Sequence, residues 1–137
     1  MSAPKPTLEQ RRAKHALEMV QSLDDKTAGK YKSYADGLPA SIVMNGLGQA
    51  AATLLAQARG VQNDPHYFLY QHLESWLCTS DEPTAPFSDQ TSLIEAITNT
   101  DQSTYVHAQS EALAYMVWLK KFAQAFLSDD ENKQEEA

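Results

Sequence analysis

The segment that follows Asp101 constrains the fold more than any other part of the chain. Apolar side chains recur there every three or four residues, which is the period of one face of an α-helix. The pattern continues far beyond the length of an ordinary strand, so it predicts a long helix. The stripe consists of Tyr105, Ala108, Ala112, Tyr115, Met116, Leu119, Phe122, Ala123 and Phe126.

The composition extends this prediction to the whole chain. There are 19 Ala and 14 Leu but only 5 Val and 3 Ile, which favours helices over pleated sheets. At 137 residues the chain has the length of one domain. We therefore expect an all-α, single-domain, compact bundle of five to six helices.

Three helices are predicted in the first half. The first spans residues 8–23, and a short second one spans 30–36 and ends at Gly37-Leu38-Pro39. The third spans 39–58, with room for a bend at Asn45-Gly46. It is read as one helix because its apolar side chains keep one phase: Val43, Leu47, Ala51, Leu54, Leu55 and Ala58.

The second half predicts two more helices before the long one. Asp64-Pro65 is a start signal for a helix that runs to about Cys78. Residues 79–90, which include two prolines, are expected to form a surface loop. A short helix from Thr91 or Ser92 to Thr98 follows.

Charge is distributed unevenly along the chain. The whole sequence has 11 basic and 18 acidic side chains, a net charge of −7 that argues against a general nucleic-acid coat. Residues 1–32 nevertheless hold seven bases and four acids, whereas residues 128–137 hold five acids and one base. We expect a flexible arm at 1–6, a helical domain at 7–127 and an acidic disordered tail at 128–137.

Several classes of protein are disfavoured by what the sequence lacks. No apolar run is long enough to cross a bilayer, and the first six residues do not resemble a signal peptide, so we expect a cytoplasmic protein with no membrane contact. Cys78 is the only cysteine, and the four histidines show no metal-binding spacing. Phosphate-loop, dinucleotide and nucleophile-elbow motifs are also missing. We expect no catalytic residue, cofactor or metal, and hence no enzyme.

Two features leave alternatives open. Arg12 lies within the apolar arc of the first helix, where it either pairs with an unidentified internal acid or binds phosphate. The Asn45–Gln49 block offers bare backbone and two side-chain amides, suited to close helix packing or to hydrogen bonds with sugar and phosphate.

The long helix carries a second apolar stripe away from the first. Its members are Val106, Leu113 and Val117, and Lys121 lies at its rim. A helix that is apolar on two sides is either central in the core or part of a contact between subunits.

Three segments together resemble a known family. They are residues 10–17 (QRRAKHAL), 37–50 (GLPASIVMNGLGQA) and 111–123 (EALAYMVWLKKFA). In this order and spacing they are similar to the small, fifth subunit of the Cmr complex, the type III-B CRISPR RNA-guided effector. The resemblance covers about residues 8–127, and the 37–50 block is its most specific part.

The resemblance implies a non-catalytic helical subunit of an antiviral ribonucleoprotein. Copies would stack head to tail into a minor filament beside the guide-binding repeat-type subunits and the large subunit, and would help to hold guide RNA paired to target RNA. The candidates for RNA-backbone contacts are Arg11, Arg12, Lys14, Lys30, Lys32, Lys120 and Lys121; those for the subunit interface are Val106, Leu113, Val117 and Lys121. The acidic composition supports an alternative, an adaptor that binds only protein.

Overall fold

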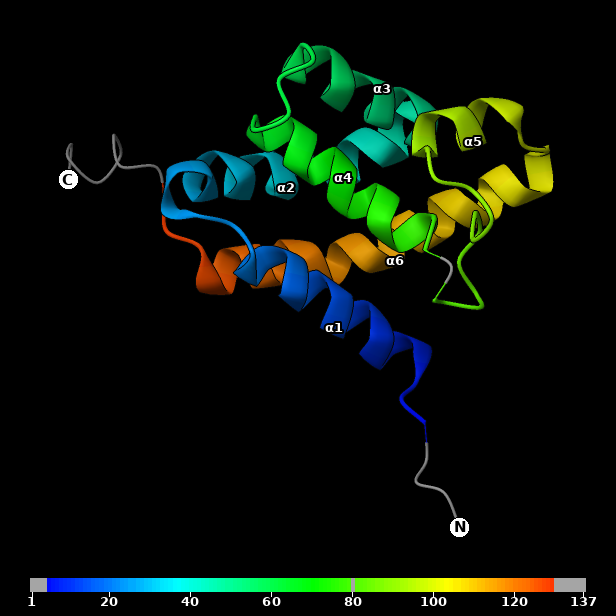
Figure 1. Ribbon diagram of the computed structural model, residues 1–137, viewed down its shortest axis with the longest axis horizontal. Helices are drawn as coiled ribbons and strands as arrows, with labels where there is room; N and C mark the ends of the chain where they lie inside the picture. Colours follow the sequence, from blue (N-terminus) through cyan, green and yellow to red (C-terminus); the bar gives the residue numbers. More distant parts are fainter. Residues whose placement is uncertain (1–4, 80, 130–137) are drawn as a thin grey trace.

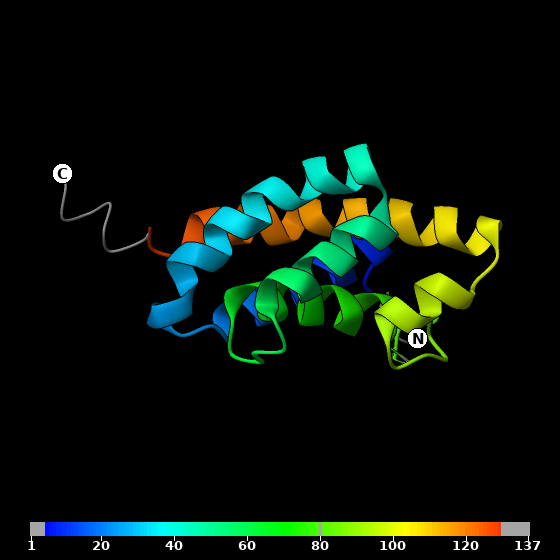
Figure 2. The same ribbon diagram turned by 90° about the horizontal axis from the view of Figure 1, so that it is seen from above.

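Six helices form the fold in the computed structural model, which describes residues 5–79 and 81–129 (Figures 1 and 2). They are α1 (Leu8–Gln21), α2 (Asp25–Asn45), α3 (Leu47–Ala58), α4 (Pro65–Leu77), α5 (Leu93–Asn99) and α6 (Gln102–Phe126). No strand occurs among these residues, and the predicted all-α bundle of five to six helices is confirmed. The ends of the predicted arm and tail, residues 1–4 and 130–137, lie outside the described residues.

The longest helix, α6, extends along the molecule and organises the bundle (Figure 1). Helices α1 and α2 both pack along it, while α4 packs on α2 and α3. Phe126, at the end of the predicted stripe, is exposed, but six of its members are buried: Ala108, Ala112, Tyr115, Met116, Leu119 and Ala123. The small alanine side chains let the neighbouring backbones approach closely, so that α1 and α2 can both pack along α6.

Local capping signals explain why the starts of several helices could be predicted from the sequence. Thr7 and Gln10 form a capping box at α1, as each side chain bonds the other's backbone N–H. Asp64, Ser92 and Asp101 accept backbone N–H groups at the starts of α4, α5 and α6. Because these signals lie within three residues of the start they mark, the sequence alone was sufficient to place them.

The predicted break at Gly37-Leu38-Pro39 was wrong. Helix α2 continues through Pro39, and the chain breaks instead at Gly46, where φ is +87° and ψ is 157°. Proline disfavours a helix interior, but here packing prevails. One buried face crosses the proline without a change of phase: Tyr31, Ala35, Leu38 and Ile42. The single helix predicted over 39–58 is therefore divided between α2 and α3.

Residue 79 and residues 81–90 are non-helical, as predicted, but they do not form a purely surface loop. Glu82, Ala85 and Phe87 are all buried. The Phe87 N–H donates to the carbonyl of Leu77 at 3.0 Å, which holds the segment against the end of α4. The segment therefore belongs to the packed body of the protein.

None of the helices in the described part of the chain combines the length and the hydropathy that crossing a bilayer requires.

Candidate interaction surfaces

Arg12 forms the internal ion pair that was one of its two predicted roles. Its Nε and Nη2 donate to the two carboxylate oxygens of Glu111 at 2.6 and 2.7 Å, and its Nη1 donates to Glu9 at 3.1 Å. Trp76 Nε1 donates to Glu111 at 2.9 Å as well. Glu111 on α6 is the acid that the sequence could not identify, since 99 residues separate it from Arg12.

Arg11, another candidate for RNA-backbone contacts, already binds a carboxylate, although its side chain is 36% exposed. Its Nε and Nη2 donate to Glu82, and its Nη1 donates to the carbonyl of Pro6 at 2.7 Å. The guanidinium and hydrogen bonds from Thr84 lower the pKa of the Glu82 carboxyl to about 2. Helical phase could not reveal this contact, because Glu82 belongs to a distant loop that folds back onto α1.

The lysine candidates divide into paired and unpaired groups. Lys32 Nζ lies 2.8 Å from Asp129, and Lys120 Nζ lies 3.5 Å from Asp36. Lys14, Lys30 and Lys121 are exposed and form no ion pair within residues 5–79 and 81–129. Of the seven predicted RNA-backbone candidates, these three have charges that no carboxylate of the described chain neutralises directly.

The second apolar stripe of α6 lies on the outside of the molecule. Val106 is 57% exposed and Val117 is 50% exposed, while Leu113 is half-buried and Lys121 is exposed beside them. The interpretation of this stripe as core is therefore excluded for the two valines. Contact between subunits, the other interpretation, stays a prediction.

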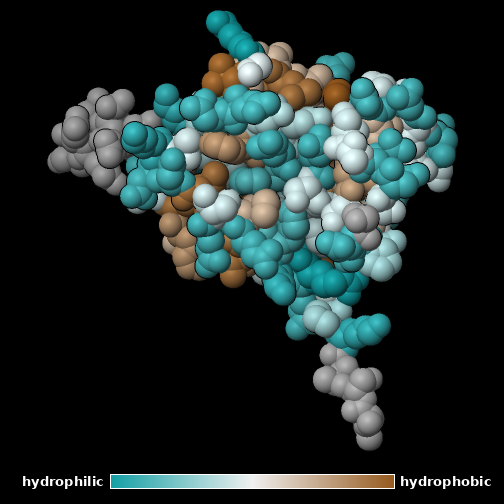
Figure 3. All heavy atoms as spheres, in the orientation of Figure 1, coloured by the Kyte–Doolittle hydropathy of each residue, from teal (hydrophilic) through white to brown (hydrophobic). Residues whose placement is uncertain are grey.

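Helix α2 adds two exposed side chains that sequence reasoning placed wrongly or missed. Val43 was assigned to an inward stripe but is 66% exposed, and Met44 is 81% exposed. The break at Gly46 changes the direction of the chain, so Val43 does not share a phase with the residues of α3. The space-filling view shows other apolar areas, over α3 and near the C-terminal end of α6 (Figure 3).

The glycine-containing block at the α2–α3 junction serves helix packing. The Leu47 N–H donates to Gln109 Oε1 at 2.9 Å, and the Gly48 N–H donates to the Tyr105 hydroxyl at 2.8 Å. A Cβ on Gly48 would lie 3.2 Å from Ile97. Side chains of α6 thus cap α3, and these two N–H groups are not free to bind phosphate.

His15 makes a contact that resembles a nucleophile–base pair. Its Nε2 lies 2.9 Å from Ser75 Oγ, and its Nδ1 lies 2.6 Å from the Tyr115 hydroxyl. Ser75 is inside α4, so its backbone N–H is used in the helix and cannot stabilise an oxyanion as it does in a nucleophile elbow. The contact joins α1, α4 and α6 as a structural bond.

Cys78 and His72 are packing residues in this structure. Burial raises the pKa of the Cys78 thiol to about 12, with smaller contributions from Glu74 and Asp89, so the reactive thiolate is disfavoured. His72 is buried, and its Nδ1 lies 2.6 Å from the Tyr31 hydroxyl. Across the described residues, no three metal-binding side chains gather at one point.

The comparisons with known proteins agree with the resemblance. Residues 8–126 match the model of the family described as CRISPR-associated protein (Cas_Cmr5). The fold is similar to the crystal structure of a CRISPR-associated Cmr5 family protein from Thermus thermophilus, with a TM-score of 0.68 and 26% sequence identity. That match covers 90% of this chain and 100% of the other. The chain therefore belongs to the Cmr5 family of CRISPR-associated proteins and is a subunit of the Cmr complex.

Proposed function

We propose that this protein is a non-catalytic structural subunit of a type III-B CRISPR ribonucleoprotein. In this role it stacks head to tail with copies of itself in a minor filament and helps to hold guide RNA paired to target RNA for antiviral defence. The observation that carries the proposal is the exposed stripe of α6 formed by Val106, Leu113 and Val117, here called the α6 stripe. Large apolar side chains that remain exposed in line on one helix are typical of surfaces that a partner covers.

A head-to-tail stack requires two different, complementary surfaces that do not close into a small ring. The α6 stripe supplies one of them, with Lys121 at its rim. A carboxylate placed inside such a contact is costly only when the partner docks, since in the free protein it remains in water. This difference separates an interface residue from a core residue.

The test is Val117→Glu in the full chain. Thermal unfolding should change little, because the side chain is half exposed, while sedimentation should show that self-association and incorporation into the complex are lost. Lys121→Glu should give a milder and salt-sensitive assembly defect.

Val61→Glu is the matched control, since Val61 is 49% exposed, close to the 50% of Val117, and lies after α3 and outside α6. If Val117→Glu assembles as well as Val61→Glu, the α6 stripe is not an interface.

RNA binding would rest on Lys14, Lys30 and Lys121, whose charges remain available. Each lysine that contacts a phosphate releases counterions, and its loss lowers the salt dependence of binding by about 0.7 to 0.9 in the log–log slope. Lys14→Glu should therefore weaken target-RNA binding by the assembled complex and reduce that slope. Arg59→Glu is the control with the same change in charge at another exposed position.

The alternative function, an acidic adaptor that binds only protein, is favoured by a specific observation. Four of the seven basic candidates already contact carboxylates: Arg11, Arg12, Lys32 and Lys120. The adaptor predicts that RNA is not retained even at low salt and that Lys14→Glu has no effect on RNA binding. Equal RNA affinity and equal salt slope for Lys14→Glu and the parent protein would select this alternative.

A further inference from the structure

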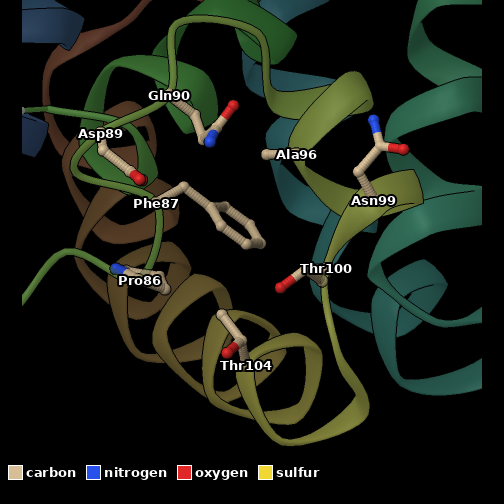
Figure 4. A pocket seen from close by; sticks show the side chains of 8 residues that line it. All are labelled: Pro86, Phe87, Asp89, Gln90, Ala96, Asn99, Thr100 and Thr104. Atoms are coloured by element: carbon tan, nitrogen blue, oxygen red, sulfur yellow. The ribbon is translucent and has the colours of Figure 1, made fainter.

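A polar hollow lies where the loop before α5 meets the end of α5 and the start of α6 (Figure 4). Its volume is about 280 Å³, just below the range of about 300 to 1,000 Å³ for small-molecule sites. The lining residues are Pro86, Phe87, Asp89, Gln90, Ala96, Asn99, Thr100 and Thr104. Asp89 is the only charged residue among them, and no cationic side chain lines the hollow. Its size suits one long side chain better than a cofactor.

The walls of the hollow are fixed before any ligand arrives. The loop is held by the bond from the Phe87 N–H to Leu77, and a turn closes where the Gln90 N–H donates to the Phe87 carbonyl at 2.9 Å. Arg11 anchors the same loop from α1 through Glu82. A preformed site avoids the entropic cost of ordering a loop when a ligand binds.

The polar groups at this hollow have unused hydrogen-bonding capacity. The Asp89 carboxylate, the Gln90 side-chain amide and the Thr100 hydroxyl receive or donate no hydrogen bond among the described residues. Figure 4 shows the Phe87 ring and the Thr100 hydroxyl directed into the hollow from opposite sides, with Asp89 and Gln90 on the loop side. Phe87 and Ala96, both buried, provide the apolar floor.

We propose that this hollow is a docking pocket for an arginine side chain of a partner protein. The methylene stem would lie against Phe87 and Ala96, and the guanidinium would donate to the Asp89 carboxylate and the Gln90 side-chain carbonyl oxygen on the loop side, with Thr100 on the opposite wall. A guanidinium presents a planar set of five donors and accepts nothing, which matches a site rich in acceptors and marked by one negative charge. Hydrogen bonds to a charged carboxylate are the strong ones of this set.

The charge around the hollow favours a protein ligand over RNA. The negative field of Asp89 is not neutralised by a neighbouring cation among the described residues and extends to Cys78. RNA would bring phosphates into that field, whereas a basic peptide is attracted by it. A wider hollow of about 510 Å³, lined by Gln71, Glu74 and Ser75 among others, shares Gln90 with the pocket and offers polar groups to residues next to the arginine.

The test uses the isolated full-length chain and a short blocked peptide, acetyl-Gly-Arg-Gly-amide, followed by NMR. Citrulline in place of arginine is the matched ligand, because it keeps the shape and loses the charge. The arginine peptide should give saturable shifts at Gln90 and Thr100, and the citrulline peptide should bind at least about ten-fold more weakly. Asp89→Asn should weaken binding of the arginine peptide by a similar factor. Glu95 is an exposed acid of α5 outside the pocket lining, so Glu95→Gln should change the affinity less than about two-fold.

Three outcomes would overturn the proposal. Equal binding of the two peptides would show that charge is not recognised. An equal loss in Asp89→Asn and Glu95→Gln would indicate general electrostatic attraction. Saturable shifts at Gln90 and Thr100 with adenosine, but not with the arginine peptide, would assign the pocket to a nucleobase. Since no RNA–complex or stacking measurement is involved, failure here is distinct from failure of the proposed function.

Discussion

The two faces of α6 depart from the usual arrangement, in which charged side chains are exposed and apolar side chains are buried. The face toward α1 and α4 buries Glu111, which is only 5% exposed, whereas the opposite face leaves Val106 57% exposed and Val117 50% exposed. The buried acid is fully bonded, by Arg12 and Trp76, while each valine keeps half or more of its surface uncovered by the described chain. The inner charge therefore fixes the position of α1 on α6, and the two outer valines remain exposed in the described chain.

A buried ion pair contributes geometry more than net stability. Desolvating Arg12 and Glu111 costs several kcal/mol, which their hydrogen bonds largely offset. A pair of apolar residues would have filled the same space but would not have fixed the register of α1 against α6.

The largest expected effect comes from breaking the inner face. Glu111→Ala leaves the Arg12 guanidinium and the Trp76 N–H without their main acceptor and should lower the free energy of unfolding by about 3 to 5 kcal/mol. Urea unfolding monitored by circular dichroism measures this change. Glu18→Ala, at an exposed position of α1, is the control and should change stability by less than about 0.5 kcal/mol. Equal effects of the two variants would show that the buried pair does not hold α1.

The next effect appears on acidification. Burial lowers the pKa of His72 to about 4 from an ordinary value near 6.5, so the unfolded chain binds a proton at a higher pH than the folded protein does. Stability is therefore fully present above about pH 6.5 and is lost as the pH falls toward 4, by about 3 kcal/mol. His15, whose pKa burial also lowers, adds to the loss in the same direction.

His72→Gln separates this contribution, because glutamine does not titrate and keeps an acceptor for the Tyr31 hydroxyl. The variant should unfold with a flatter dependence on pH between about 7 and 4. An unchanged dependence would mean that His72 is protonated without cost in the folded state.

The smallest effects compare an inward and an outward glycine. Gly46→Ala should destabilise the protein by about 1 to 3 kcal/mol, because φ is +87° and the added Cβ would lie 3.1 Å from the Tyr105 hydroxyl. Gly37→Ala should stabilise it by about 0.5 to 1 kcal/mol, because that position is inside α2 and nothing lies within 4 Å of the added Cβ. If both substitutions shifted the melting temperature in the same direction, this would contradict the assignment of the helix break to Gly46.

The sequence was strongest where the signal is local. The helix class followed from the period of apolar residues, and the starts of four helices followed from caps within three residues of the start. It failed at Pro39, because the preference of a proline against helix interiors is outweighed by a buried face that only the neighbouring helices α4 and α6 create. It also assigned Val43 to the core, as it could not know where the helical phase is reset.

For the interaction surfaces, the amino-acid pattern predicts that α6 is apolar on two sides and that the Arg12 charge requires an acid or a phosphate as its partner. Which side of α6 is covered, and that the partner is Glu111, follows only from how the helices pack. The physical reason is distance along the chain: Glu82 and Glu111 lie 71 and 99 residues from the arginines that they bind. Side-chain periodicity reports the faces of one helix, whereas such pairings depend on how separate helices and loops fold back on one another.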